Sequence, residues 1–585
     1  MSKASAWRAV LAPPVLSLLL NTAGLTWGLP ARWHPDEKAD AVARMARGLG
    51  LRPESFVNPS LPLYLQLPLV WTQQQATDRG LVMGARADPL FLCRFLSALA
   101  GAGAVLLLGI VSARTAPGQV PWPAWFLAVA PGFVNLCHFA TPEAWLLLGC
   151  AATLLLSVEH AAGRAPASVL GLVLGLTVST KYTGAALLAP ALAAVWLRPR
   201  PLLAHRSERP VLLAAGGAAW ASGLALLWFG PAIASRLHLK DARLLHPETA
   251  AAFVHGLGRS ALLLGAALVA LAVLGAWPRT AGWAARLARR EVVVVGLLAL
   301  VGFFVGTPFA ATEPLAFLSD LAFNAQTRAE YKGLVGEPTS LVAYLALLGD
   351  AMTWPLVAAA AIGLGFALTT AAREPASLIL LLGAVVPYLL VASSGHRAMR
   401  FLAPMLPATA FLAARGISAV IPSRRAAGLV RGAVFTRAAL ASVLVVRLFF
   451  KDSRQEAERW MESHVPAGAT VDLIANHVGY APRLPEGRVL RLVPTLSREM
   501  APKERFVEAA ARYPEEASAW LILTASFYER FLEHPDQQPE RARFFGDLLA
   551  GRGAFEVAAR FRQQGFWRPE VEFVDPEIVI LRKRR

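Results

Sequence analysis

Long apolar runs separated by short basic breaks fill the first three quarters of the chain. Many of them approach or exceed the roughly 18 residues that a helix needs to cross a bilayer. The pattern predicts a polytopic helical membrane protein. The first run, residues 10–29, is too long and too poorly followed by a small-residue cleavage site for a removed signal peptide, so we expect a retained span. We place twelve further spans near residues 89–113, 121–138, 143–160, 167–180, 182–197, 211–229, 260–277, 292–307, up to 371, 377–392, up to 424 and 433–450.

The basic residues between the runs predict the orientation. Cytoplasmic loops carry an excess of Lys and Arg, and Lys3 and Arg8 precede the first span. We therefore expect a cytoplasmic N-terminus and, after about 13 spans, an extracytoplasmic C-terminus, in the inner or plasma membrane of the cell. The first outer loop then covers about residues 30–88. Within it, residues 40–50 and 61–74 are expected to form amphipathic helices on the membrane surface.

The composition becomes that of a soluble domain after residue 450. Short apolar runs alternate there with polar, helix-forming segments, which predicts a small α/β domain. We thus expect a transmembrane domain over residues 1–450 and a soluble extracytoplasmic domain over residues 451–585. Helices are predicted at 455–464, 504–512 and 540–549, and buried strands at 469–474 and 520–524.

Composition and charge agree with a membrane protein and exclude one class of partner. Of 585 residues, 56% are hydrophobic and 16% are charged, whereas soluble domains carry about 25% charged residues. The net charge of +18 could indicate nucleic acid. Because Arg and Lys concentrate in the breaks between spans, we interpret the charge as orientation in a lipid bilayer and expect no nucleic-acid partner.

The most informative polar stretch follows the first span directly. Asp36 and Glu37 are adjacent carboxylates at the outer end of that span. Ionisable groups near a bilayer are functional candidates by default. We therefore predict that Asp36 is a catalytic base, with Glu37 beside it. The competing interpretation is that the two residues cap an interfacial helix.

The predicted topology brings three more polar groups to the outer face. Acidic and basic side chains together suit a reaction between a neutral hydroxyl or amine and an anionic, lipid-borne donor. A carboxylate would accept the proton of the acceptor, and cations would hold the phosphate and stabilise its charge as it departs. The three groups are the turn with His138 and Glu143, the connection with Lys181 and Tyr182, and the loop with His396 and Arg400.

Each of these residues also has a structural explanation. Lys181 could extend its ammonium group to the interface. Glu143 could satisfy the exposed amides of a helix N-terminus, and His138 could fill a polar turn. His396 and Arg400 lie four residues apart, on one face of a helix.

Several motifs, in this order and topology, resemble the GT-C superfamily of polyprenyl-phosphate-sugar-dependent glycosyltransferases. The resemblance is to the family 39 type, which includes protein O-mannosyltransferases and the lipid A aminoarabinose transferase. The motifs are His34-Pro35-Asp36-Glu37, Ser179-Thr180-Lys181-Tyr182-Thr183-Gly184, His396-x-x-x-Arg400-Phe401 with Pro404 and Pro407, Asp452-x-Arg454 with Ala457 and Trp460, Pro466-x-Gly468, and Ser526-x-Tyr528-x-Arg530-Phe531.

The resemblance implies a GT-C fold and an inverting displacement. A sugar would pass from polyprenyl phosphate to a protein, lipid or glycan acceptor, and polyprenyl phosphate would be released. Asp36 would match the acid of the first outer loop, and Glu143 the second acidic position. Many relatives carry Asp at that second position, so a divalent cation such as Mg²⁺ or Mn²⁺ on Asp36 and Glu143 stays an open question.

The resemblance also implies the residues that bind the donor. Lys181, Tyr182, His396 and Arg400 would contact the donor phosphate. Three further candidates have weaker support from the pattern, namely His34, Tyr331 and Lys332.

Two other functions fit a chain with this many spans. A transporter or lipid flippase is one, although transporters often show repeated halves and none is visible here. A non-catalytic membrane scaffold that displays the C-terminal domain is the other. Replacement of Asp36 distinguishes an enzyme from both.

Overall fold

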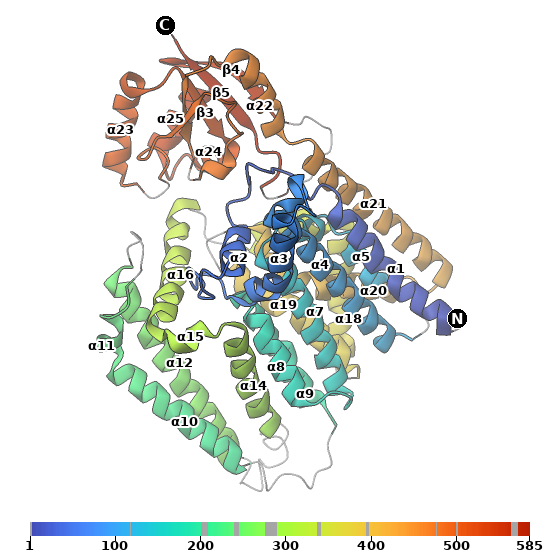
Figure 1. Ribbon diagram of the computed structural model, residues 1–585. Coiled ribbons are helices and arrows are strands. Elements are labelled where there is room, and N and C mark those ends of the chain that lie inside the picture. Colours follow the sequence, from blue (N-terminus) through green and yellow to red (C-terminus); the bar gives the residue numbers. More distant parts are fainter. Residues whose placement is uncertain are drawn as a thin grey trace.

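The computed structural model describes residues 3–117, 119–199, 209–238, 245–274, 289–335, 341–371, 373–393, 397–475, 477–498, 501–562, 571 and 573–584. A large helical part carries a smaller α/β domain at one end (Figure 1). The N-terminal helix α1 begins far from that domain, and the C-terminus lies within it (Figure 1).

Apolar helices make up the larger part. The predicted runs at 89–113, 143–160 and 377–392 each form one helix, and a proline starts each of the three. The helices of this part are α1 (Lys3–Thr22), α4 (Pro89–Thr115), α5 (Trp122–Ala128), α6 (Pro131–Cys137), α7 (Pro142–Ala161), α8 (Ala167–Val178), η2 (Tyr182–Leu187), α9 (Leu188–Leu197), α10 (Arg209–Trp228), α11 (Gly230–Ala234), α12 (Pro247–Leu274), α14 (Arg290–Gly306), α15 (Phe309–Thr312), α16 (Pro314–Val335), α17 (Leu341–Met352), α18 (Trp354–Thr370), α19 (Pro375–Ala392), η4 (Met399–Met405), α20 (Leu406–Val420) and α21 (Arg424–Phe450).

By length and composition, seven of the described helices could cross a membrane, or eight if the bent pair α17–α18 counts as one span. The pair bends by 117° at Thr353, which has a positive φ of 72°. Other predicted spans are shorter or interrupted. The run at 121–138 is divided into α5 and α6, because Pro131 starts a new helix. Seven or eight of the described helices are thus long and apolar enough to span a membrane, and the count of 13 spans stays a prediction.

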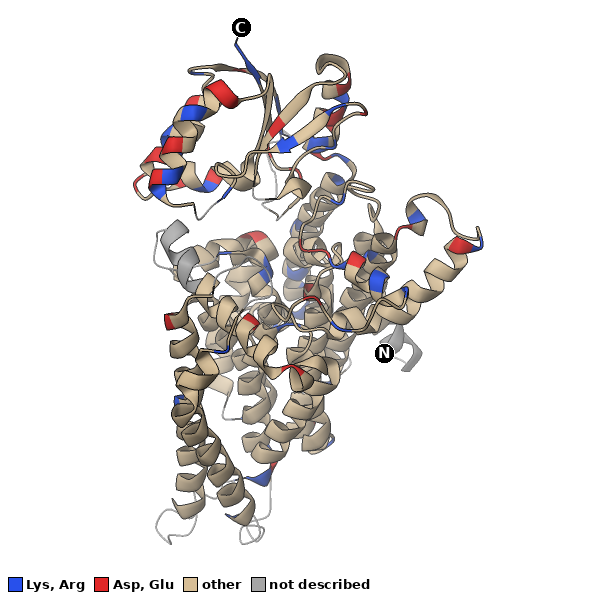
Figure 2. Cartoon of the chain, turned by 60° about the vertical axis from the view of Figure 1, so that its left-hand side comes forward, with Lys and Arg blue, Asp and Glu red and all other residues tan. Residues whose placement is uncertain are grey.

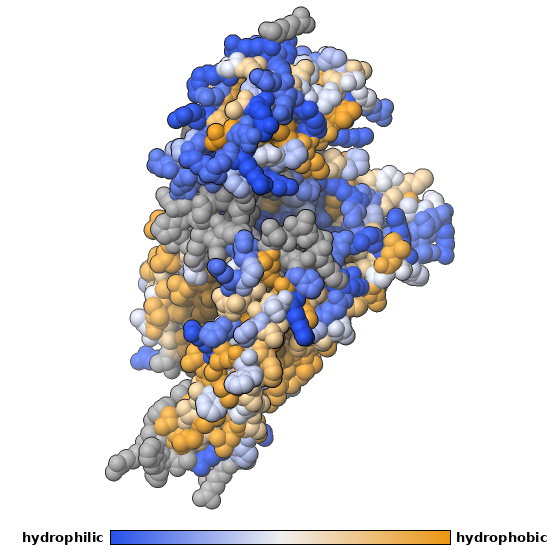
Figure 3. Space-filling view, turned by 90° about the vertical axis from the view of Figure 1, so that its left-hand side faces the viewer, coloured by the Kyte–Doolittle hydropathy of each residue, from blue (hydrophilic) through white to orange (hydrophobic). Residues whose placement is uncertain are grey.

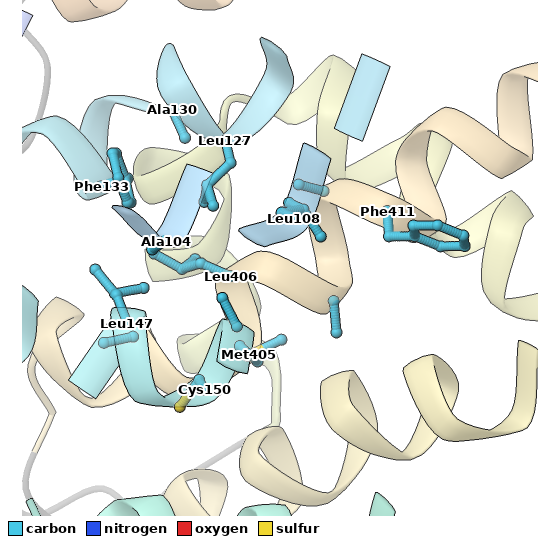
Figure 4. Packing of buried hydrophobic residues seen from close by; sticks show 14 of the residues in the cluster. Ala104, Leu108, Leu127, Ala130, Phe133, Leu147, Cys150, Met405, Leu406 and Phe411 are labelled. Carbon is cyan, nitrogen blue, oxygen red and sulfur yellow. The ribbon is translucent and has the colours of Figure 1, made fainter. Parts of the chain in front are cut away.

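Close helix packing builds the core of this part. The core includes Leu108 of α4, Phe133 of α6, Leu147 of α7 and Leu406 of α20, which Figure 4 shows pointing toward one another. Glycines let some helices approach to backbone contact. A Cβ on Gly416 of α20 would lie 2.0 Å from a carbonyl oxygen of α18. The core thus surrounds α7 and α20 and supports the helix ends that carry polar groups.

Charge and hydropathy divide the molecule in two. The helical part presents a largely apolar surface, whereas the C-terminal domain is hydrophilic (Figure 3). Figure 2 shows Lys, Arg, Asp and Glu gathered on that domain and at its junction with the helices. Helices α10 and α12 are mostly exposed, with 17% and 22% of their most apolar windows buried. Such apolar, exposed helices suit contact with lipid.

The first outer loop contains two helices near the positions predicted for them. They are α2 (Ala39–Ala46) and α3 (Leu61–Asp78), followed by the short η1 (Gly84–Ala87). Between residues 308 and 340, a stretch outside the predicted spans, helices α15 and α16 form.

The C-terminal domain is a five-stranded mixed sheet with the order β2-β1-β3-β5-β4. Strand β1 pairs in parallel with β2 and β3, while β5 is antiparallel to both β3 and β4. The predicted strands at 469–474 and 520–524 are β1 and β3, the buried centre of the sheet. The elements are α22 (Ser453–His464), β1 (Thr470–Ile474), η5 (Val478–Tyr480), β2 (Val489–Leu492), α23 (Lys503–Glu516), β3 (Trp520–Thr524), α24 (Ala525–Glu533), α25 (Pro539–Leu549), β4 (Phe555–Phe561) and β5 (Ile578–Lys583).

Candidate active site

Asp36 lies in a turn of the first outer loop, where its carboxylate reaches a cavity. Its backbone N–H donates to Nδ1 of His34 over 3.1 Å, which fixes the turn. The imidazole of His34 is buried between the rings of Phe139 and Phe573, at centroid distances of 4.3 and 4.0 Å. The Asp36 side chain is 50% exposed and pairs with Nη1 of Arg400 at 3.3 Å. A carboxylate in this position can accept a proton from an incoming molecule.

Glu37 points the other way, into the protein. Its two oxygens accept from Nε and Nη2 of Arg94, each at 2.7 Å, and Oε1 also accepts from the backbone N–H of Ala140 at 2.8 Å. The Glu37 and Arg94 side chains are 3% and 1% exposed. Glu37 is not among the residues that line the cavity. Its contacts hold the outer loop against α4 and the turn before α7.

The second acidic residue comes from the first turn of α7. Pro142 starts this helix and Glu143 follows it, so the carboxylate lies in the first turn, at the N-terminal end of the helix. Nζ of Lys181 donates to Oε1 of Glu143 in a buried ion pair. Lys181 occupies the break between α8 and η2, and its Nζ also lies 5.4 Å from the ring centroid of Phe401. The break between two short helices thus places a cation beside an acid, as expected for a discontinuous span.

These groups share one cavity of about 300 Å³. Asp36 comes from the loop after α1, Glu143 from α7, Lys181 from the α8–η2 break and Arg400 from η4. The cavity therefore presents two carboxylates and two cations, each carboxylate paired with one cation. His34, Tyr182, Asn324 of α16 and Phe573 of the C-terminal domain also line it.

Burial makes His34 a neutral residue. Burial, together with the nearby charges of Arg400, Arg94 and Arg454, lowers the pKa of His34 well below its usual range. The neutral imidazole accepts the amide proton of Asp36 at Nδ1, so its own proton sits on Nε2. His34 thus shapes the turn that presents Asp36.

The remaining predicted residues fall into three groups. Tyr182 lines the cavity and donates its hydroxyl to the carbonyl of Phe56 over 2.6 Å. His138 is buried outside the cavity lining, with Nδ1 2.6 Å from the carbonyl oxygen of Val134, Nε2 2.9 Å from that of Ala23, and its ring stacked on Phe449 at 4.1 Å. A neutral ring donates to one of these two carbonyls. His396 and the side chains of Tyr331 and Lys332 lie outside the described residues.

The structure adds residues that the motifs did not indicate. Arg94 is a lone arginine inside the predicted span at 89–113, and an ionisable group in such a run was a signal available in the sequence. Asn324 donates its amide to the carbonyl of Val57 over 3.0 Å. Phe573 lines the cavity although it lies 537 residues after Asp36 in the chain (573 − 36), and no local pattern could have revealed it.

The part of the chain that the structure describes contains no group of three or more His, Cys, Asp or Glu residues able to hold a metal ion. Asp36 and Glu143, the two acids suggested for a divalent cation, are each paired with Arg400 or Lys181. Because Arg400 and Lys181 already pair with these two carboxylates, the carboxylate oxygens in this arrangement do not fit a divalent ion.

Comparison with known proteins gives structural neighbours only. No protein-family model matches the chain, and no curated protein matches it. The fold is similar to the archaeal oligosaccharyltransferase AglB from Archaeoglobus fulgidus in complex with an inhibitory peptide and a dolichol-phosphate, at 13% identity and a TM-score of 0.48, over 92% of this chain and 72% of that one. It is also similar to ArnT from Cupriavidus metallidurans bound to undecaprenyl phosphate, at 12% identity and a TM-score of 0.46, over 99% and 98% of the two chains.

At 12–13% identity, these two neighbours show a likeness of fold alone. Because both TM-scores are below 0.5, these likenesses carry no argument about function. Any function for this chain has to rest on the geometry of the cavity.

Proposed function

We propose that the chain is a membrane glycosyltransferase that moves a sugar from a polyprenyl-phosphate carrier to an acceptor at the outer face of the membrane. One observation carries the proposal. The half-exposed carboxylate of Asp36 shares a cavity of about 300 Å³ with Arg400, Lys181 and Glu143. A base and two cations around one space are what a displacement at a phosphate-linked carbon requires.

In the proposed reaction, Asp36 accepts the proton of an acceptor hydroxyl or amine. The acceptor atom bonds to the anomeric carbon, and the bond from that carbon to the phosphate oxygen breaks. The electron pair leaves with the polyprenyl phosphate, and the anomeric centre inverts. Arg400 and Lys181 stabilise the negative charge that builds up on the phosphate.

The ion pairs of the structure suggest the order of events. Arg400 pairs with Asp36, so a cation offsets the charge of this carboxylate. A donor phosphate binding Arg400 would draw the guanidinium away and free Asp36 to act as base. Glu143 would position Lys181, and Glu37 would support Asp36 by holding the loop. A Mg²⁺ or Mn²⁺ ion would have to displace Arg400 and Lys181 to reach Asp36 and Glu143.

The predicted topology supports a site on the outer side. We propose 13 spans, formed by α1, α4, α5–α6, α7, α8, η2–α9, α10, α12, α14, α17–α18, α19, η4–α20 and α21. The start of α1 and the C-terminal domain lie at different ends of the helical part (Figure 1). With a cytoplasmic N-terminus, the domain at 451–585 and the cavity beneath it face outward. The acceptor, whether protein, lipid or glycan, would approach there.

Substitution of Asp36 tests the proposal. The full chain is reconstituted in lipid vesicles with undecaprenyl phosphate carrying labelled mannose, glucose, galactose or aminoarabinose, and source-cell membranes supply the acceptor. The wild type should transfer one of these sugars, and Asp36→Asn should lose about 10²- to 10⁴-fold in rate, the usual contribution of a general base.

Asp40→Asn is the matched control, since Asp40 is a 72% exposed carboxylate in the same loop, and it should retain activity. Full activity of Asp36→Asn would remove Asp36 from its role. A wild type that moves the intact lipid across the bilayer without cleaving it would favour the transporter.

A further inference from the structure

One wall of the cavity comes from the C-terminal domain. Among the described lining residues, Phe573 alone belongs to residues 451–585. Its ring centroid lies 4.0 Å from that of His34 and 5.2 Å from Cζ of Arg400. It therefore packs between the turn that presents Asp36 and the cation that pairs with Asp36.

The backbone around Phe573 is held in an unusual conformation. Phe573 and Asp575 have positive φ angles of 66° and 52°, which residues with a side chain rarely adopt. Such angles persist only where the surroundings enforce them, and they cluster at functional sites. They are thus a reason to look for a role at this position.

The start of α22 supplies the enforcing contacts. Nη2 of Arg454 donates to the carbonyl of Phe573 over 2.8 Å, and the N–H of Asp575 donates to Oδ2 of Asp452 over 2.8 Å. The N–H of Ser453 donates in turn to Oδ1 of Asp575, also at 2.8 Å. Asp452 and Arg454 are fully buried and paired with each other. Three consecutive residues thus fix the segment that carries Phe573.

We propose that Phe573 is a specificity-determining residue that keeps water away from the reacting carbon, so that the sugar passes to the acceptor and is not hydrolysed. The inference rests on the proposed glycosyl transfer. A base that is half exposed can take a proton from water as well as from an acceptor. An apolar ring beside His34 and Arg400 covers this side of the cavity, and exclusion of water is a recognised way to suppress hydrolysis.

The competing reaction is hydrolysis of the donor, which breaks the same bond as sugar transfer. A water oxygen bonds to the anomeric carbon, and its proton passes to Asp36. The bond between that carbon and the phosphate oxygen breaks, and the polyprenyl phosphate leaves with the electron pair. The products are free sugar and polyprenyl phosphate. The ratio of free to transferred sugar therefore reports on access of water, independently of the overall rate.

The test uses Phe573→Ala in the full reconstituted chain, with the labelled undecaprenyl-phosphate sugar that the wild type cleaves and with source-cell membranes as acceptor. Removing the ring leaves space beside polar groups, which water can fill. We expect the ratio of free to transferred sugar to rise several-fold. Phe573→Tyr, which keeps the ring, should restore a ratio near that of the wild type.

Phe561→Ala is the matched control. Phe561 is a partly buried ring at the end of β4, in the same domain and outside the cavity lining. Its loss should leave the ratio unchanged even if it lowers stability. An unchanged ratio in Phe573→Ala, or an equal rise in Phe561→Ala, would overturn the role of Phe573 while the proposed function stands. If the wild type cleaves none of the donors, the proposed function fails and this inference with it.

Discussion

The buried pair of Arg94 and Glu37 gives a sharp prediction about stability. Arg94→Met removes a guanidinium group that donates to both oxygens of Glu37 at 2.7 Å and to the carbonyls of Leu25 and Trp27 at 2.9 and 2.5 Å. The Glu37 carboxylate would keep the N–H of Ala140 as a donor. An uncompensated carboxylate would then be buried.

The expected loss in the free energy of unfolding follows from the burial of the Arg94–Glu37 pair. Removing one partner of a buried ion pair costs about 3–5 kcal/mol, and side-chain exposures of 1% and 3% place this pair in that class. Glu37→Gln keeps the shape but only one acceptor oxygen, and it leaves the buried Arg94 guanidinium without a counter-charge, so it should cost a similar amount, about 3–5 kcal/mol. In the double variant Arg94→Met/Glu37→Leu no charge is left unpaired, and its cost should be well below the sum of the costs of Arg94→Met and Glu37→Leu measured singly.

The assay is denaturant unfolding of the detergent-solubilised chain, followed by tryptophan fluorescence, with slopes and midpoints compared across variants. Arg44→Met is the control. Arg44 pairs with Glu54 in the same outer loop at 2.7 Å, but the two side chains are 47% and 64% exposed, and such pairs contribute about 0–1 kcal/mol. The reasoning is refuted if Arg94→Met differs from Arg44→Met by less than about 0.5 kcal/mol, the usual limit of surface effects.

Two further predictions concern packing and pH. Gly416→Val should abolish folded, monodisperse protein in size-exclusion chromatography, because a Cβ there would lie 2.0 Å from the carbonyl oxygen of Ala359, whereas Gly365→Ala, with nothing within 4 Å, should be tolerated. Burial lowers the pKa of His34 in the folded chain. In the unfolded chain this histidine takes up a proton near pH 6.5, whereas in the folded chain it stays neutral at that pH. The stability that neutral His34 contributes is present above about pH 6.5 and is lost as the pH falls toward the lowered value. His34→Asn should therefore flatten the pH dependence of the thermal unfolding midpoint below that pH; an unchanged profile would contradict the assignment.

Apolar periodicity predicts the helices well because the bilayer and the core both select long apolar runs. The spans at 89–113 and 143–160 are found as α4 and α7. The interruptions were harder to predict. Proline divides the run at 121–138, while the bend between α17 and α18 depends on the backbone of Thr353, which no periodicity reveals.

The candidate site was predictable only in part, for a related reason. Motifs in sequence indicated Asp36, Lys181 and Arg400, and the structure places all three around one cavity. His138 shares its turn with Glu143, yet its ring nitrogens face backbone carbonyls elsewhere. A sequence motif gives the residues of a turn, but the direction of each side chain depends on tertiary packing. Phe573 shows the same limit, since its position depends on contacts with α22.

The Asp36–Glu37 doublet shows how adjacent acids can take different roles. Two consecutive carboxylates are chemically alike, and the motif that singled out Asp36 as the base did not reveal the direction of the Glu37 side chain. Because the backbone turns at Asp36, Glu37 faces Arg94 inside the protein while Asp36 faces the cavity. An inward carboxylate held by three hydrogen bonds has little freedom to accept a proton. The half-exposed one is available to a substrate, so catalysis should depend on Asp36 directly and on Glu37 through the position of the loop.

The C-terminal domain contributes to the same arrangement. Arg454 donates to the carbonyl of Phe573, and its Cζ lies 5.1 and 4.5 Å from the ring centroids of Trp27 and Trp33. Nε1 of Trp27 in turn donates to Oδ2 of Asp452 over 3.0 Å. The outer loop before Asp36 and the segment with Phe573 therefore pack on one buried Asp452–Arg454 pair. Any change that loosens this pair should move the base and the cavity wall together, which makes the C-terminal domain a structural part of the site.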